Sequence, residues 1–151
     1  MRFLVALLLV ALLPCVASAQ PGEGAGPVAP QVWLDVRVVT VYHATAAQTD
    51  DNPLVTADGT RVTSDSRICA LSRELLERWG GPVRYGDAVW VDVPDRELAG
   101  FWFVHDTMAA DVSGYVDLLV PEGVLECWHD GPVRVAGGCV QAEIDVTLVR
   151  W

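Results

Sequence analysis

The segment VHDTMAADVSGYVDLL, at residues 104–119, contains three aspartates, two of which, Asp106 and Asp117, lie beside or within apolar runs of β type. Asp106 directly follows the predicted strand 100–105, and Asp117 lies inside the predicted strand 115–120. A strand–loop–strand return of this kind brings both carboxylates towards the same end of a β-structure. Apolar neighbours would partly desolvate Asp106 and favour the protonated carboxyl that a general acid requires. In the alternative interpretation, both aspartates only accept backbone hydrogen bonds and organise the loop.

The rest of the chain predicts further short strands. Its alternating or continuous apolar runs end at glycine, proline and aspartate, as strands do. The expected strands cover residues 32–42, 54–56, 60–63, 88–93 and 142–149, with a turn at Ala57-Asp58-Gly59. Many short strands in one small chain favour a closed barrel, because a barrel removes exposed sheet edges.

One helix is expected after Ser72, which can cap its N-terminus. Apolar residues recur there at helical spacing, at Leu71, Leu75, Leu76 and Trp79. Trp79 is therefore expected in the core. The Gly-Gly-Pro sequence at residues 80–82 ends the helix.

The first 19 residues have the pattern of a cleavable signal peptide. Arg2 gives a positive start, residues 3–13 are continuously apolar, and small residues at 17–19 precede the expected cleavage before Gln20. The apolar run is short for a membrane span. The sequence therefore predicts export, with no stable membrane span in the mature protein.

Export leaves a leader, residues 20–30, rich in glycine and proline, and one domain, residues 31–151. Cys15 is a candidate for lipid attachment, but Pro14 stands where that signal requires a small residue. Lipidation is therefore not expected, and the protein is predicted to be released into the periplasm or the outer envelope.

The charge of the chain excludes one class of partner. The formal net charge is −10, and all ten basic residues are arginine. Binding of nucleic acid requires clustered positive charge, so nucleic acid is not an expected partner.

The cysteines suit an exported protein. Of the three that follow the signal peptide, Cys127 and Cys139 flank a segment with turn signals, and we favour a disulfide between them. Cys69 lies in an apolar context, where a buried and unreactive thiol is expected. The Cys and His spacings do not match a zinc site, and no metal is expected.

Six pieces of the chain occur in the order found in a known family. They are residues 39–42 (VTVY), 53–60 (PLVTADGT), 68–72 (ICALS), 85–89 (YGDAV), 104–107 (VHDT) and 114–118 (GYVDL). Together they resemble the three-aspartate (3D) domain, which occurs in membrane-bound lytic transglycosylase A and is related to rare lipoprotein A and expansins. The resemblance implies a mainly β fold, a six-stranded double-psi β-barrel with one or two short helices.

The resemblance also implies roles for individual residues. Asp106 takes the place of the family's catalytic aspartate, in a motif that usually reads Asp-Thr-Gly, and Asp117 takes the place of the aspartate in the following strand. Ser72 stands where the third aspartate is expected, and Met108 replaces the glycine after Asp106-Thr107. For Ser72 we favour helix capping over catalysis.

A groove of this family would bind sugar hydroxyl groups. The residues expected to bind substrate are Tyr42, Thr56, Asp58, Ser72 and Thr107. His105 is expected to point away from Asp106, because adjacent residues of a strand face opposite sides. His43 is expected in a solvated loop.

The implied activity is cleavage of the glycan strands of peptidoglycan without water, as in a lytic transglycosylase. Asp106 would donate a proton to the glycosidic oxygen and then accept one from the C6 hydroxyl, so that a 1,6-anhydro sugar forms. No cofactor is needed, and a monomer is expected. Two alternatives remain open: a non-catalytic, expansin-like glycan-binding module, and an envelope protein with a purely structural role.

Overall fold

The computed structural model of the chain describes residues 31–49, 51–124, 127–130 and 139–150. The expected signal peptide (1–19), the leader (20–30) and Cys15 lie outside the described residues. Within the described part, no helix has the length and apolar character needed to cross a bilayer.

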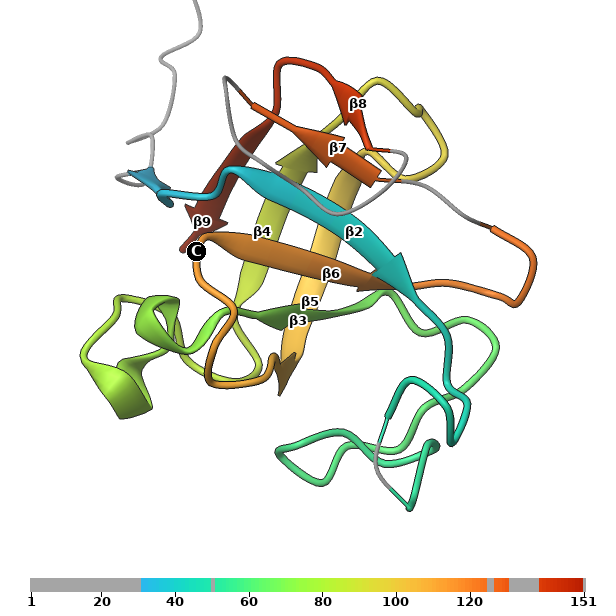
Figure 1. Ribbon diagram of the computed structural model, residues 1–151. Helices are drawn as coiled ribbons and strands as arrows, with labels where there is room; N and C mark the ends of the chain where they lie inside the picture. Colours follow the sequence, from blue (N-terminus) through green and yellow to red (C-terminus); the bar gives the residue numbers. More distant parts are fainter. Residues whose placement is uncertain (1–30, 50, 125–126, 131–138, 151) are drawn as a thin grey trace, which may run out of the picture.

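The described chain is mainly β, as predicted, and its strands form one sheet that is not closed (Figure 1). Its strands are β1 (Val32–Trp33), β2 (Val38–Tyr42), β3 (Ile68–Leu71), β4 (Ala88–Asp92), β5 (Gly100–Thr107), β6 (Tyr115–Leu119), β7 (Cys127–His129), β8 (Val140–Gln141) and β9 (Asp145–Val149). Two short 3-10 helices, η1 (Arg73–Leu75) and η2 (Glu77–Trp79), follow β3.

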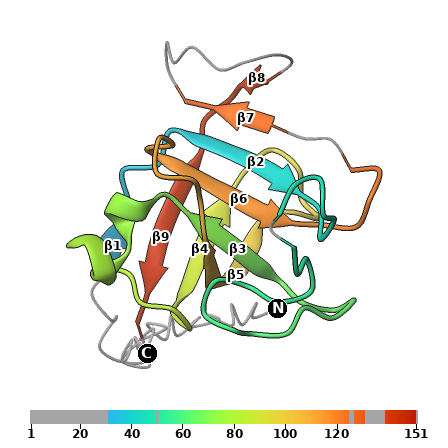
Figure 2. The ribbon, with the colours of Figure 1, turned by 60° about the horizontal axis from the view of Figure 1, so that its bottom comes forward.

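These strands form one sheet in the order β1-β9-β4-β5-β3-β6-β2-β7-β8. Strand β2 runs parallel to β6, and β3 runs parallel to β5, while β3 and β6 are antiparallel neighbours. Figures 1 and 2 show β2 and β6 side by side in both views. Two parallel pairs are thus joined through an antiparallel pair at the centre of the sheet.

The main core lies on the inner face of this sheet. Cys69 of β3 pairs in register with Val104 of β5 and Leu118 of β6, and all three side chains are fully buried. Because strand residues alternate between faces, the neighbours of these residues point outward. Four of the outward side chains form a second, smaller apolar cluster: Tyr42, Ile68, Ala70 and Leu119.

The cysteines take the states that the sequence favoured. A disulfide joins Cys127 of β7 to Cys139, which directly precedes β8. Cys69 is a free thiol in the main core, and burial raises its pKa, followed by the negative charges of Asp117 and Asp106. A neutral, inaccessible thiol is unreactive.

The predicted strand 32–42 is divided in two. Residues 34–37 leave the sheet because β1 pairs with β9, whereas β2 pairs with β6 and β7. Leu34 and Val36 nevertheless remain buried. The alternation of apolar and polar residues in this segment therefore reflects the burial of Leu34 and Val36, and does not indicate a continuous strand.

The predicted helix after Ser72 is wrong. Leu76 has an extended backbone between η1 and η2, and it forms a β-bridge with Val83. The carbonyl of Leu75 accepts the N–H of Val83, so the returning chain uses backbone groups that a helix would need. A helix of this length gains little by itself, and tertiary pairing replaces it. Trp79 is consequently not in the core but 40% exposed.

The predicted hairpin at residues 54–63 is reduced to a single β-bridge between Val55 and Arg61. Its turn is present, because the N–H of Gly59 donates to the carbonyl of Thr56. Gly59 has a φ of +90°, which glycine adopts without strain. The turn is important for the site described next.

Candidate active site

The candidate site lies on the outer face of the four strands at the centre of the sheet. Thr40 of β2 pairs with Asp117 of β6, Asp117 pairs with Ala70 of β3, and Ala70 pairs with Asp106 of β5. These four residues form one row across the strands, so both predicted aspartates face the same side. The small side chain of Ala70 stands between them and leaves space above the sheet.

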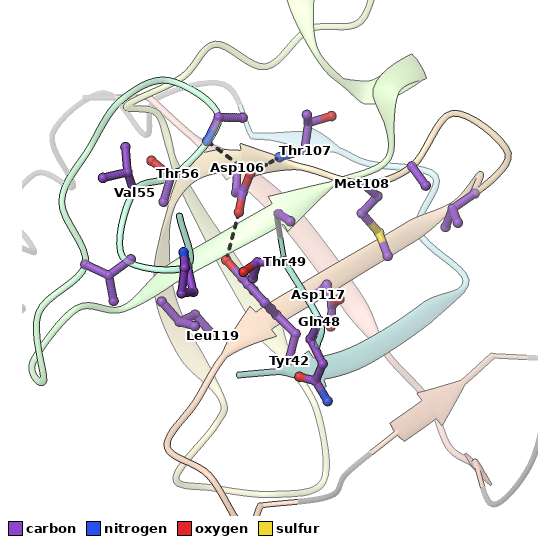
Figure 3. Close-up of a pocket in the computed structure, with 16 residues that line it drawn as sticks. Tyr42, Gln48, Thr49, Val55, Thr56, Asp106, Thr107, Met108, Asp117 and Leu119 are labelled. Atoms are coloured by element: carbon purple, nitrogen blue, oxygen red, sulfur yellow. Dashed lines mark hydrogen bonds between the residues drawn. The ribbon is translucent and has the colours of Figure 1, made fainter. Parts of the chain in front are cut away.

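A pocket of about 440 Å³ occupies this space (Figure 3). Its floor includes Tyr42, Ala70 and Leu119, and its walls come from residues of the segments 48–49, 53–62 and 107–112. Both Asp106 and Asp117 line it. A pocket of this size suits a ligand of a few rings.

Asp106 is held by three hydrogen-bond donors from three parts of the chain. The backbone N–H groups of Ala57 and Thr107 donate to its Oδ1, at 3.1 and 2.9 Å. The Tyr42 hydroxyl donates to Oδ2 at 3.2 Å, as Figure 3 shows. The carboxylate is therefore fixed in orientation at the rim of the pocket.

Asp117 lies in a less polar environment. Its Oδ1 accepts one hydrogen bond from the Thr40 hydroxyl, at 2.6 Å. Burial raises its pKa to about 6, and the negative charge of Asp106 adds to this effect, whereas the Thr40 hydrogen bond and the charge of His43 oppose it. A carboxyl with this pKa holds its proton in mildly acidic solution.

The negative charges of both carboxylates act on the hydroxyl of Tyr42. Its side chain is buried, and burial, followed by the charge of Asp106, raises its pKa. The phenol therefore stays neutral and acts as a hydrogen-bond donor at every physiological pH. The structure thus brings Tyr42 to the predicted groove, where its hydroxyl contacts Asp106.

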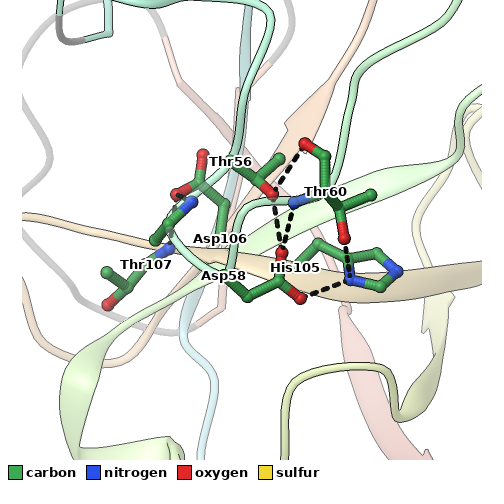
Figure 4. Close-up of polar contacts among 7 residues, drawn as sticks. Thr56, Asp58, Thr60, His105, Asp106 and Thr107 are labelled. Atoms are coloured by element: carbon green, nitrogen blue, oxygen red, sulfur yellow. Dashed lines mark hydrogen bonds and ion pairs between the residues drawn. The ribbon is translucent and has the colours of Figure 1, made fainter.

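Asp58 does not line the pocket but closes the turn beside it (Figure 4). Its Oδ1 accepts hydrogen bonds from the Thr56 hydroxyl and the Thr60 N–H, and its Oδ2 lies 2.7 Å from Nδ1 of His105. Burial by itself would raise the pKa of Asp58, but the hydrogen bonds from His105, Thr60 and Thr56 lower it to about 2. The prediction that Asp58 contacts substrate is therefore not supported by its position.

His105 has a function that the sequence did not indicate. Strand β5 has an irregularity here, because Cys69 pairs with Val104 and the next residue, Ala70, pairs with Asp106. His105 is the extra residue of this bulge. It points away from Asp106, as expected, and its ring binds Asp58 and the Thr60 hydroxyl. The bulge thus fastens residues 56–60 to the strand that carries Asp106.

Ser72 lies at the N-terminus of η1, but its side chain neither caps the helix nor reaches the pocket. Its side chain is fully buried and makes no capping hydrogen bond. Its hydroxyl instead accepts the N–H of Tyr115, at 2.9 Å, and lies 4.0 Å from Sδ of Met108. The hydroxyl therefore connects β3 with the start of β6, and both earlier interpretations are wrong.

The remaining predicted residues lie at the pocket. Thr56 and Thr107 line it, and Met108 lies at the same wall. The Thr56 hydroxyl donates to Asp58, and Thr107 contributes its N–H to Asp106.

Two residues near the carboxylates were missed or misplaced. Thr40 binds Asp117, and it could have been found because it is two residues from Tyr42 and shares its face. His43 is buried, with Nδ1 3.1 Å from the Val120 carbonyl, so its prediction as a solvated loop residue is wrong.

Within the described residues, no group of three His, Cys, Asp or Glu side chains is arranged to hold a metal ion. Comparison of the sequence with protein-family models and with curated proteins gave no match. The function must therefore be argued from the site.

Proposed function

We propose that this chain cleaves the glycan strands of peptidoglycan in the bacterial cell envelope, as a lytic transglycosylase does. The observation that carries the proposal is the pair of carboxyls in one pocket, Asp106 and Asp117, with different surroundings. Asp106 accepts three hydrogen bonds, whereas burial raises the pKa of Asp117 to about 6. Carboxyls in such contrasting environments commonly divide the acid and the electrostatic roles.

The strand pairing also supports the proposal. The parallel pairs β2–β6 and β3–β5, joined through β3 and β6, support our assignment of the fold as a double-psi β-barrel. We assign its six strands to β2, β3, β4, β5, β6 and β9. Export by a signal peptide at residues 1–19 would deliver this barrel to the peptidoglycan.

The proposed roles differ from those that the resemblance implies. Asp117 is the carboxyl that holds a proton in mildly acidic solution, so we assign proton donation to it. Asp106 is fixed by Tyr42 and two backbone N–H groups. Its negative charge stabilises the positive charge that develops at the anomeric carbon.

The reaction then proceeds with one proton donor and no water. Asp117 gives its proton to the glycosidic oxygen while the bond from that oxygen to the anomeric carbon breaks. The C6 hydroxyl of the same sugar forms a new bond to the anomeric carbon, and its proton returns to Asp117. The products are a 1,6-anhydro sugar and a free hydroxyl end, and the carboxyl is regenerated.

The test is incubation of the purified protein with peptidoglycan, followed by mass spectrometry of the soluble products. We expect anhydromuropeptides from the parent protein and from Asp35→Asn, a control that changes an exposed aspartate paired with Arg37. We expect a loss of at least about a hundredfold for Asp117→Asn and Asp106→Asn. Hydrated products would show a hydrolase, and equal product from all variants would refute the assigned roles.

A second candidate is a non-catalytic, expansin-like module that binds glycan. It is favoured by Ser72, which replaces the third aspartate and is fully buried. This module would bind peptidoglycan and release no soluble product, with the same result for parent and Asp117→Asn. The experiment above therefore separates the two candidates.

A further inference from the structure

Four aromatic side chains are exposed on neighbouring strands outside the pocket. Trp33, Trp90, Phe101 and Phe103 are 64%, 41%, 40% and 47% exposed. We call these four residues the aromatic strip. Large apolar side chains that gather on a surface commonly mark a binding site.

The register of the sheet places the aromatic strip on one face. Trp33 of β1 and Trp90 of β4 both pair with Thr147 of β9, and Trp90 also pairs with Phe101 of β5. Paired residues of adjacent strands lie on the same face. Figure 2 shows β1, β9 and β4 in this succession.

The rings cover the sheet and are not isolated. Thr147 and Ala88 belong to the same outer face, yet they are only 6% and 4% exposed. Trp90 and Phe101 meet edge to face, with ring centroids 4.9 Å apart. The strip thus holds one aromatic pair in contact, with Trp33 and Phe103 on the same face beside it.

The strip is continuous with the pocket. Phe103 pairs with Ile68 of β3, whose side chain belongs to the cluster under the pocket floor. Further along the same two strands, Asp106 pairs with Ala70. The outer face of one sheet therefore carries the carboxyls over β2, β6, β3 and β5, and the aromatic strip over β5, β4, β9 and β1.

Polar groups accompany the rings. Asp92 and Asp145 form the next outward-facing pair along β4 and β9, after the buried pair Val91 and Val146, and both aspartates are exposed. At the other end, Phe103 shares a hollow of about 340 Å³ with Arg84, Asp87 and Arg150. Such a surface offers ring faces together with groups that bind hydroxyls.

We propose that the aromatic strip is a second binding region for the same polysaccharide, in which further sugar rings of a long glycan strand lie on Trp90 and Phe103. Pyranose rings present apolar C–H faces to aromatic rings and hydroxyls to carboxylates and guanidinium groups. A sugar polymer of low charge is compatible with a net charge of −10, which repels nucleic acid. The proposal rests on the proposed function only in its choice of polymer.

The experiment measures binding without turnover. The Asp117→Asn variant would be titrated with soluble chito-oligosaccharides of increasing length, and its retention on insoluble peptidoglycan would be measured. The double variant Trp90→Ala/Phe103→Ala is made in this background. The matched control is Trp79→Ala, because Trp79 is as exposed as Trp90, at 40%, but lies in η2.

We expect the double variant to bind long oligosaccharides about tenfold more weakly, with little change for the shortest ones, and to be less well retained on peptidoglycan. Trp79→Ala should bind like the parent. Unchanged affinity at all lengths, or no saccharide binding by the parent, would overturn the inference. A change only in oligomeric state, measured by sedimentation, would show instead that the strip binds a second copy.

This outcome is independent of the cleavage assay. If the double variant binds more weakly and the parent forms no anhydro product, the aromatic strip is supported as a binding region and the proposed transglycosylase activity is rejected. Cleavage by the parent together with unchanged binding by the double variant would support the transglycosylase and reject the aromatic strip as a binding region.

Discussion

Thr40 and Asp117 are coupled by a single short hydrogen bond, of 2.6 Å, at the floor of the pocket. The bond favours the ionised carboxyl and is the largest contribution that lowers the pKa of Asp117, against the greater effect of burial. The proton that we assign to catalysis is thus controlled by a residue that need not touch the substrate. Thr40 is in this sense a positioning residue.

Replacing Thr40 by valine keeps the size of the side chain and removes the donor. We expect the pKa of Asp117 to rise from about 6 by on the order of one unit, because a bond to the charged form is lost. Titration of the carboxyl carbons by NMR measures this shift directly. If the protein is a transglycosylase, activity in Thr40→Val should also extend to higher pH.

The matched control is Thr40→Ser, which retains the hydroxyl. Its titration should follow that of the parent. A shift of equal size in both variants would mean that packing, and not the hydrogen bond, determines the protonation of Asp117.

Asp117 and Tyr42 could be found from the sequence because strands β6 and β2 pair in regular register. Asp106 could be found because it follows an apolar run, although the bulge at His105 interrupts the alternation directly before it. Ser72 could not be placed correctly, because its hydroxyl binds Tyr115, 43 residues later in the chain. A local pattern predicts capping, and only the tertiary pairing of β3 with β6 reveals the actual partner.

The turn at residues 57–60 and the bulge of β5 act as one element. The Asp58–His105 contact fastens the turn, and the N–H of Ala57 in that turn donates to Asp106. The N–H of Asp58 also donates to the carbonyl of His105, at 3.3 Å. The position of the Ala57 N–H therefore depends on side chains outside the pocket (Figure 4).

Replacing Asp58 by alanine should release this turn. We expect faster amide hydrogen exchange at residues 57–60 and a fall in any glycan cleavage of about tenfold, because Asp106 loses a fixed donor. The pKa of Asp58, about 2, lies below the usual value of 3.8. Its stabilising effect is therefore complete above about pH 4 and is lost as the pH falls through about 2.

The conservative variant Asp58→Asn provides the control. Its amide oxygen can accept the hydrogen bonds of Thr56 and Thr60, and its amide nitrogen can donate to a neutral His105 ring. Exchange at residues 57–60 should remain slow. Rapid exchange in Asp58→Asn, or slow exchange in Asp58→Ala, would contradict the role of this contact.

The sequence predicted most strands but not where each one is interrupted. Leu34, Val36 and Leu76 lie in patterns that fit a strand and a helix. All three are buried, but none of them belongs to a regular strand or helix. In both places the backbone is redirected by a partner outside the local pattern: the distant strand β9 in one case, and Val83, after the turn at residues 80–82, in the other. The β-bulge at His105 likewise depends on the register of β3 and β5, which local composition does not determine.

Taken as a whole, the molecule uses the two faces of one sheet for different purposes. The inner face holds the apolar core, and the outer face carries two carboxyls and the aromatic strip. Placing Asp117 on a partly buried position costs folding free energy whenever its carboxyl is charged. This cost can be measured on the whole domain.

We predict that Asp117→Asn is more stable than the parent at neutral pH. Because the folded pKa of Asp117, about 6, exceeds the usual 3.8, the folded state binds more protons than the unfolded state between these values, and the stability of the parent falls as the pH rises through this window. The asparagine does not ionise, and its amide oxygen can still accept the Thr40 hydroxyl. The gain should be on the order of 1–3 kcal/mol above about pH 6 and close to zero near pH 3.

Denaturant unfolding of the parent and the variant at several pH values measures this difference. Asp35→Asn, at an exposed position, should leave the pH dependence of the parent unchanged. A pH-independent difference between parent and Asp117→Asn would show that the carboxyl is not destabilised in its ionised form. If Asp117→Asn gains stability at neutral pH and loses cleavage, the buried carboxylate serves function at the expense of stability.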